Sequence, residues 1–75
     1  MNRSRRLTAI IEREDDGFVA LCPEMDVASQ GNSIEEARAN LTEALTLLLE
    51  TADPSEIEQR FHPELFVTHV EVPVF

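Results

Sequence analysis

Residues 31–53 read GNSIEEARANLTEALTLLLETAD and predict one long amphipathic helix, residues 33–52, around which the rest of the chain is organised. Ser33 is a favourable N-cap, and Glu36 stands three residues later, so the two are expected to form a capping box. Pro54 ends the helix because proline disfavours helical geometry in the residue before it. Apolar side chains follow helical spacing along one stripe: Ile34, Ala37, Leu41, Ala44, Leu45, Leu48 and Ala52.

The length of the chain, 75 residues, predicts a single small domain spanning residues 1–75. The hydrophobic core of so small a domain contributes little net free energy of folding, so disulfides, metals or partners often supply the remaining stability. Cys22 is the single cysteine and cannot form an internal disulfide, and no cluster of Cys and His suggests a structural metal. We therefore expect self-association, as a dimer or a larger oligomer, and no cofactor. A lone thiol also suits the reducing cytoplasm.

The charge is strongly acidic, with fifteen Asp and Glu against six Arg, no lysine, and a net charge of −9. This balance disfavours direct binding to nucleic acid and permits a basic protein partner. The arginines within residues 1–6 are expected to belong to a solvated terminus. Because the apolar runs are only a few residues long, we expect neither a signal peptide nor a transmembrane span, and a cytoplasmic protein.

The first part of the chain predicts an antiparallel hairpin. Residues 7–14 and 18–22 both show the period-2 alternation of strands. Between them, Asp16 and Gly17 form the Asp-Gly pair that is a strong signal for a tight hairpin turn.

A third strand and a fourth complete the expected sheet. Pro23 interrupts the strand pairing because it has no backbone N–H to donate to a neighbouring strand. Residues 27–30 then predict a short strand. Gly31 suits a turn that needs positive φ before the helix. Residues 65–72 predict the last strand. The order β-β-β-α-β indicates an α+β fold, an antiparallel meander with the long helix packed on one face.

The segment after the long helix predicts one helical turn capped by Ser55, followed by the strand at residues 65–72. Apolar residues occur on both faces of this strand, which fits a strand that is covered twice or that pairs with a second subunit. One face carries the candidates for self-association: Phe66, Thr68, Val70 and Val72.

No specific catalytic constellation is found. His69 and Glu71 share one strand face as an acid–base pair would, but solvation is the commoner reason for such a pair. Nearby carboxylates should raise the pKa of Cys22, which argues against a nucleophile. Candidate metal-binding carboxylates flank the hairpin turn and are expected to spread into water: Glu12, Glu14, Asp15 and Asp16. We predict that the protein is not an enzyme.

Residues 17–37 read GFVALCPEMDVASQGNSIEEA and resemble the HicB family of antitoxins. The resemblance continues at residues 40–45 and 70–73, so it covers most of the chain. Two small departures from the family occur: the pair Asn32-Ser33 stands where Asp and Thr are usual, and Met25 stands where Leu is common. The characteristic residues are Cys22, Pro23, Ser29, Gln30, Gly31, Ser33 and Glu36.

This resemblance implies a partial ribonuclease H-like fold and a partner of the HicA type, a small mRNA-cleaving toxin that the domain binds and occludes. Many members carry a C-terminal helix-turn-helix or ribbon-helix-helix segment that binds the promoter of the operon. The sequence shows no such segment after residue 72, so we expect no operator binding.

The leading hypothesis is therefore a non-catalytic protein-binding module that masks a basic ribonuclease, with an acidic turn that steers the partner. The contact candidates are Glu24, Met25 and Asp26. One alternative is a solitary self-assembling module without a toxin. A second alternative, a metal-dependent nuclease, needs carboxylates at strand centres, and the predicted core faces of residues 7–11 and 66–72 hold none.

Overall fold

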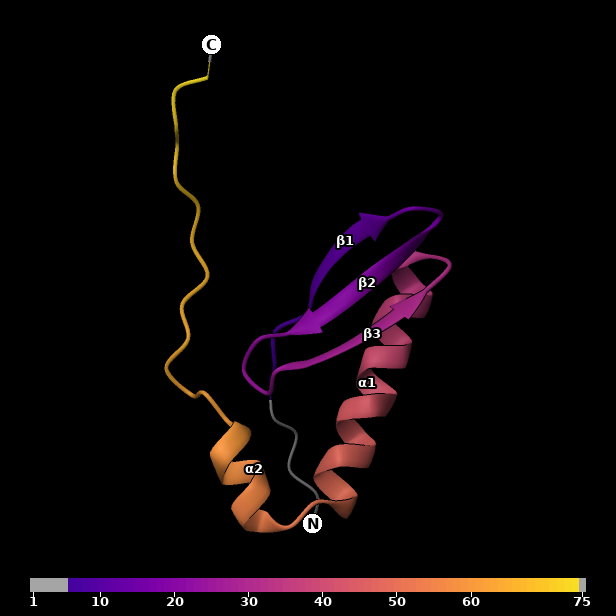
Figure 1. The fold of residues 1–75 in the computed structure, drawn as a ribbon, viewed down its shortest axis with the longest axis vertical. Coiled ribbons are helices and arrows are strands. Elements are labelled where there is room, and N and C mark those ends of the chain that lie inside the picture. The colour runs from indigo at the N-terminus through magenta and orange to yellow at the C-terminus, as the bar shows by residue number, and fades with distance from the viewer. Residues whose placement is uncertain (1–5, 75) are drawn as a thin grey trace.

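The computed structural model describes residues 6–74 and shows an α+β domain (Figure 1). Its antiparallel sheet has the strand order β1-β2-β3, formed by β1 (Ile10–Glu14), β2 (Gly17–Cys22) and β3 (Val27–Gly31). Helix α1 (Ile34–Thr51) lies across one face of the sheet, and a short helix α2 (Pro54–Arg60) follows. The predicted class and the order of the first four elements are confirmed. Residues 1–5, with most of the predicted solvated terminus, lie outside the described residues.

Strands β1 and β2 form the predicted hairpin, closed by Asp15 and Asp16. Asp15 takes a positive φ of 55°, a conformation that Asp tolerates better than most residues. Gly17 pairs with Glu14 at the end of the ladder, so these two residues flank the turn and the glycine is already a strand residue.

Strand β1 begins at Ile10, whereas the predicted strand covered residues 7–14. The difference has a local cause. The backbone N–H of Thr8 donates to both carboxylate oxygens of Glu24, each at 3.0 Å, and not to a neighbouring strand. A side chain of the turn between β2 and β3 therefore takes the hydrogen bond that would have extended the strand.

Helix α1 begins and ends within one residue of the prediction. The hydroxyl of Ser33 accepts the backbone N–H of Glu36 at 3.1 Å, as a capping box requires. The Glu36 carboxylate, however, accepts the N–H of Asn32 at 2.7 Å, one residue before the N-cap. The helix stops at Thr51, ahead of Pro54, as predicted.

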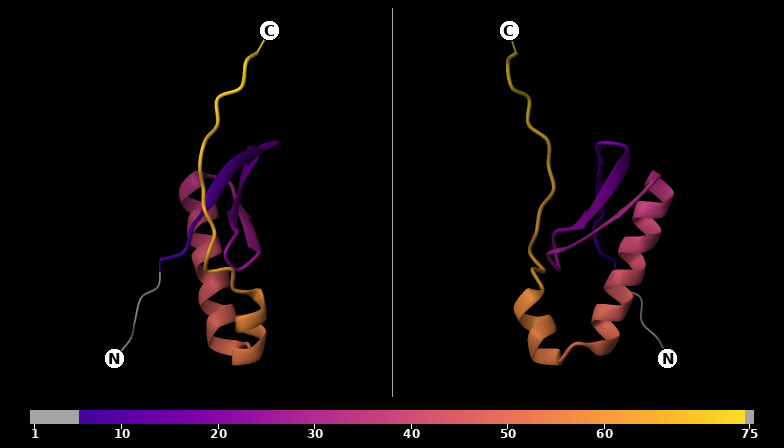
Figure 2. Two further views of the ribbon diagram at one scale, coloured as in Figure 1. Left: turned by 90° about the vertical axis from the view of Figure 1, so that its left-hand side faces the viewer. Right: turned by 45° about the vertical axis from the view of Figure 1, so that its right-hand side comes forward.

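The core lies between α1 and the sheet face that α1 covers, and the opposite sheet face carries no helix of the described chain (Figure 2). Strand register places alternate residues of β2 toward the helix. Six side chains are buried there: Ala20, Cys22, Met25, Ala37, Leu41 and Leu45. Such a core is small for a chain of 75 residues, in line with the argument from length.

Gly31 allows α1 to start close against the end of β3. A Cβ atom on Gly31 would lie 2.5 Å from the backbone N of Ala37 and 2.8 Å from the carbonyl carbon of Glu36. No glycine has a positive φ, so the conformational reason predicted for Gly31 was wrong. The absence of a side chain, which lets the helix approach the strand, is the reason that the structure supports.

Helix α2 forms where a single turn was predicted, but Asp53 and not Ser55 occupies its N-cap position. Pro54 is the first helical residue, where its missing N–H costs nothing. At the other end, Arg60 donates from Nη1 to the backbone oxygen of Met25 at 3.3 Å. This bond ties α2 to the turn between β2 and β3.

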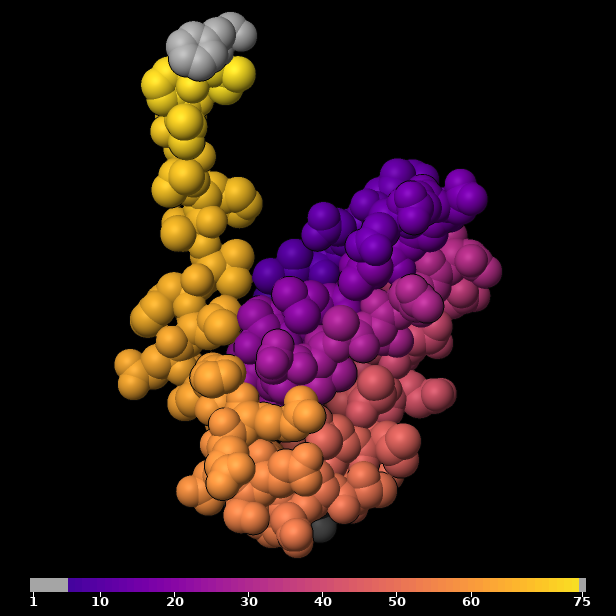
Figure 3. Space-filling view, viewed as in Figure 1, coloured from indigo at the N-terminus to yellow at the C-terminus, as the bar shows by residue number. Residues whose placement is uncertain are grey.

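The predicted fourth strand, residues 65–72, is not formed: residues 65–74 are assigned to no strand. We call residues 65–74 the C-terminal arm. It extends away from the body of the domain, and the space-filling view shows it standing clear of the sheet (Figures 1 and 3). The physical reason is that no strand of residues 6–74 lies beside the arm to accept its backbone hydrogen bonds.

Candidate protein-binding surface

The turn predicted to contact a partner mainly holds the domain together. Met25 is 1% exposed and belongs to the core, so the prediction that its side chain contacts a partner is wrong for the folded chain. Glu24 is half-buried and receives hydrogen bonds from Thr8. Asp26, with a positive φ of 56°, has an exposed side chain. One of the three predicted contacts is thus freely presented to solvent.

The carboxylate of Glu24 is the centre of a small polar cluster. Besides the backbone N–H of Thr8, the hydroxyl of Thr8 donates to Oε2 at 2.6 Å, and the Cys22 thiol donates to Oε1 at 3.5 Å. Burial alone would raise the pKa of Glu24, but the hydrogen bonds from Thr8 favour the ionised form and lower the pKa overall. Glu24 therefore acts as an ionised anchor for the start of β1.

The Cys22 thiol is fully buried, which fits the prediction of a packing role. Burial raises its pKa, and the neighbouring Glu24 carboxylate adds to the shift. The sequence predicted the direction from the carboxylate alone, whereas burial is the larger cause. A protonated thiol of this kind is a poor nucleophile.

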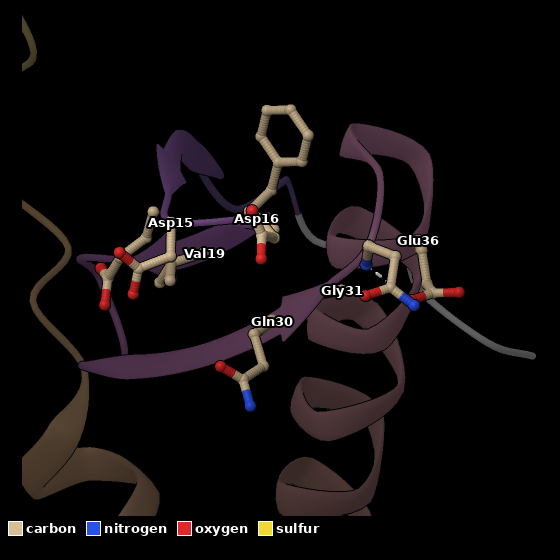
Figure 4. A pocket seen from close by; sticks show the side chains of 10 residues that line it. Asp15, Asp16, Val19, Gln30, Gly31 and Glu36 are labelled. Carbon is tan, nitrogen blue, oxygen red and sulfur yellow. Dashed lines mark hydrogen bonds between the residues drawn. The ribbon is translucent and has the colours of Figure 1, made fainter.

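The opposite end of the sheet forms an acidic hollow, a concavity of about 470 Å³ between the hairpin turn, β3 and the start of α1. Among the residues that the structure describes, four carboxylate side chains line it, and no Arg or His does. Figure 4 shows Asp15 and Glu36 on opposite sides of this view, with Gln30 between them. The four residues are Glu14, Asp15, Asp16 and Glu36.

The walls of the acidic hollow are held by hydrogen bonds between side chains and the backbone. The Asn32 N–H fixes Glu36, as described above, and the amide of Asn40 donates from Nδ2 to the backbone oxygen of Gln30 at 2.8 Å. On the neighbouring surface, the guanidinium of Arg13 lies 4.7 Å from the centre of the Phe18 ring. Gln30, Gly31, Ser33 and Glu36 therefore shape this end of the domain.

The sequence did not identify the acidic hollow. The hairpin carboxylates were expected to spread into water, and all of them are exposed. The missing part was Glu36, which the capping box brings from the helix to the same end of the sheet. The signal was present in Gly31, which permits the close approach of α1 to β3, but its consequence depends on the packing of the two elements.

A second unoccupied surface is the sheet face away from α1. Register places Ile10 opposite Leu21 and Leu21 opposite Ala28, so the three side chains form one row across the sheet. Ile10 is 40% exposed and Leu21 is 37% exposed. All four predicted self-association residues are exposed on the C-terminal arm: Phe66, Thr68, Val70 and Val72.

The structure brings no reactive pair together around the histidines. His62 lies just after α2, where its backbone N–H donates to the Glu24 carbonyl oxygen at 2.8 Å, and His69 lies on the exposed arm. Within residues 6–74, no three His, Cys, Asp or Glu side chains are grouped in a way that could hold a metal ion. The same part of the chain contains no helix that is long and apolar enough to span a bilayer.

Comparison with known proteins gives one similar sequence. The chain is 52% identical over 46 residues to a protein of Synechocystis sp. (strain ATCC 27184 / PCC 6803 / Kazusa) named UPF0150 protein ssl0738. The likeness covers 59% of this chain and 64% of the relative, whose name states no activity. No family model matches the chain, and no solved structure matches it. The chain is thus similar to a UPF0150 protein over more than half of its own length.

Proposed function

We propose that this chain is a non-catalytic protein-binding module of the HicB type, which acts in the cytoplasm as an antitoxin by covering a basic, HicA-type ribonuclease. The observation that carries the proposal is the acidic hollow, because four carboxylates and no basic side chain of residues 6–74 line it. The resemblance of residues 17–37 to HicB antitoxins supplies the identity of the partner. The reduced, buried Cys22 suits the cytoplasm.

The charge of the hollow favours a cationic ligand. The whole chain carries a net charge of −9, so its field attracts a basic surface from a distance and raises the rate of encounter. The same field repels the phosphates of free RNA or DNA. A basic ribonuclease must itself present Arg or Lys to its RNA, and an acidic domain that occupies this surface would exclude the substrate.

The hollow is prepared for binding before a partner arrives. The tight hairpin turn holds Asp15 and Asp16 at one side, and the capped start of α1 holds Glu36 at the other. A site on such elements loses less conformational freedom on binding than one on a mobile loop. Like-charged carboxylates brought together in this way repel one another until a cation lies between them.

The test is inhibition of RNA cleavage by a HicA-type ribonuclease, which is to be sought first in the reading frames beside this gene. The wild-type chain should bind the ribonuclease and stop cleavage. An Asp15→Asn/Asp16→Asn variant removes two charges from the hollow, and Asn tolerates the positive φ of residue 15. We expect association that is slower by about tenfold at low ionic strength, with a smaller difference at high salt.

The matched control is a Glu43→Gln/Glu50→Gln variant, which removes two charges from exposed positions of α1 that do not line the hollow. It should associate nearly as fast as the wild type. Equal slowing by both variants would mean that net charge matters and the hollow does not. Absence of any binding or inhibition by the wild-type chain would remove the antitoxin proposal.

A further inference from the structure

The C-terminal arm exposes large apolar side chains that a single chain leaves uncovered. Phe66 is 87% exposed and Val70 is 80% exposed, and the other large apolar residues of the arm with more than half of their surface in water are Val67, Val72 and Val74. Contiguous apolar surface of this kind marks an interaction site in soluble proteins. The arm is therefore the part of the described chain with the clearest need for a partner.

The sequence of the arm has the pattern of an edge strand. In an extended chain the even-numbered residues share one face, and all of them have high β-propensity: Phe66, Thr68, Val70, Val72 and Val74. Pro73 lacks an N–H, so it fits where its backbone faces solvent. Because backbone groups alternate in direction along a strand, the even-numbered residues would then hydrogen-bond to the neighbouring strand.

The point where the arm leaves the domain is fixed. The backbone N–H of His62 donates to the carbonyl oxygen of Glu24 at 2.8 Å, and Arg60 donates to the carbonyl oxygen of Met25 at 3.3 Å. These bonds hold the root of the arm at the turn between β2 and β3. Beyond this root the arm runs clear of its own sheet (Figure 3).

The sheet offers one free edge that suits such a strand. On the β3 side, Asn40 of α1 already donates a hydrogen bond to the backbone oxygen of Gln30. On the other side, β2 is the single neighbour of β1 within residues 6–74, so no described strand covers the outer backbone groups of β1. At ~3.3 Å per residue, residues 65–72 are long enough to cover the whole of β1.

The uncovered face of the sheet matches the apolar face of the arm. Ile10 and Leu21 lie side by side on this face, both partly exposed. An arm placed along β1 with its even-numbered side chains on the same face would extend the row by one strand. The apolar side chains of the arm and of the sheet would then cover one another.

We propose that two copies of this chain exchange their C-terminal arms, with each arm pairing along the outer edge of β1 of the other copy. Arm and edge occur on every chain, so one two-fold arrangement satisfies both copies at once and closes the assembly. Each sheet gains the fourth strand that the single chain lacks. The proposal does not rest on the ribonuclease partner: the acidic hollow contains no residue of the arm and shares only Glu14 with β1.

The charge on each copy predicts how the dimer responds to salt. Both copies carry a net charge of −9 and repel each other at low ionic strength. Screening by salt reduces this repulsion but leaves apolar burial intact. The dimer should therefore dissociate less as salt is added, whereas binding of a basic ribonuclease to the acidic hollow should weaken.

The first experiment measures mass by light scattering over a range of protein concentrations. The wild-type chain should be a dimer at high concentration. Val70→Asp places a charge in the proposed pairing face and should raise the dimer dissociation constant by at least about 100-fold. Leu47→Asp, at an exposed apolar position of α1, is the matched control and should leave the dimer unchanged. Circular dichroism checks that both variants retain α1.

The second experiment tests the pairing itself by disulfide formation in a Cys22→Ala background. In one mixture, chains that carry Val70→Cys in the arm are combined with chains that carry Ile10→Cys in β1. In a second mixture, chains that carry Val72→Cys in the arm are combined with chains that carry Glu12→Cys in β1. Disulfide-linked heterodimers should form between arm and β1 variants. Mixing Val70→Cys chains with Leu47→Cys chains should yield few.

Three results would overturn the arm exchange. One is a wild-type chain that stays monomeric at every concentration, and another is a dimer that Val70→Asp does not weaken. The third is a monomeric disulfide in a chain that carries both Val70→Cys and Ile10→Cys, because the arm would then cover its own sheet. A monomeric Val70→Asp chain should still inhibit the ribonuclease, so failure of this proposal is distinguishable from failure of the antitoxin proposal.

Discussion

Thr8 donates two groups to one carboxylate: its backbone N–H and its hydroxyl both bind Glu24, the hydroxyl at 2.6 Å. The two residues are sixteen positions apart, and their contact joins the segment before β1 to the turn between β2 and β3. This contact ends the ladder of β1 early and keeps Glu24 ionised. It also holds in place the turn between β2 and β3, to which His62 and Arg60 donate the hydrogen bonds that fix the root of the arm.

Replacement of Glu24 by Gln should destabilise the domain by about 1–3 kcal/mol at neutral pH, because hydrogen bonds to a charged acceptor are replaced by weaker ones. Urea unfolding followed by circular dichroism measures the change. Glu43→Gln, at an exposed position of α1, should change the free energy of unfolding by less than about 0.5 kcal/mol. A double-mutant cycle with Thr8→Val should give a coupling of about 1 kcal/mol.

The stability of the wild-type chain should depend on pH through Glu24. Burial opposes ionisation of this carboxyl, but the bonds from Thr8 lower its pKa below the ordinary value of 4.5. Its contribution is complete above pH 4.5 and is lost as the pH falls through the lowered pKa. The wild-type and Glu24→Gln unfolding curves should therefore converge in acid. A constant difference across this range would contradict the assignment.

Two leucines of the same helix should respond very differently to truncation. Leu41 is 2% exposed in the core and Leu47 is 59% exposed. Leu41→Ala should cost about 2–5 kcal/mol because it removes buried surface and leaves a cavity. Leu47→Ala should change stability by less than about 0.5 kcal/mol. Similar losses for both would mean that the outer side of α1 is covered in solution.

Gly31→Ala should cost about 1–3 kcal/mol, because the added methyl group would lie 2.5 Å from the backbone N of Ala37 and force α1 away from β3. The control is Asn32→Ala, at the next residue, whose side chain is exposed. Thermal unfolding compares the two. The Gly31→Ala chain should also lose affinity for the ribonuclease, since the walls of the acidic hollow would separate.

The Cys22 thiol should react slowly with a disulfide reagent in the folded protein. It is fully buried, and burial together with Glu24 raises its pKa, so little thiolate is present and less is accessible. We expect a rate at least about 100-fold below that in urea, limited by opening of the structure. Fast reaction of the native chain would show that the packing around this side chain opens readily.

The sequence by itself determined the elements whose signals are local. Ser33, Glu36 and Pro54 set the limits of α1 within one residue, because caps and breakers act over a few positions. Alternation and the acidic turn predicted the hairpin, and Pro23 marked the end of β2. The sequence singled out Gly31 as a turn residue before the helix, although the positive φ predicted for that glycine was wrong.

The tertiary structure decided what depends on contacts between distant segments. Met25 was predicted to contact a partner. It fills the core instead, because the sheet and the helix bury its side chain when they pack together. The acidic hollow joins the hairpin turn to Glu36, which are twenty positions apart. The pattern of residues 65–72 is that of a strand, yet a strand forms only where a neighbouring edge supplies hydrogen bonds. Within the described part of one chain, residues 6–74, no such edge lies beside it.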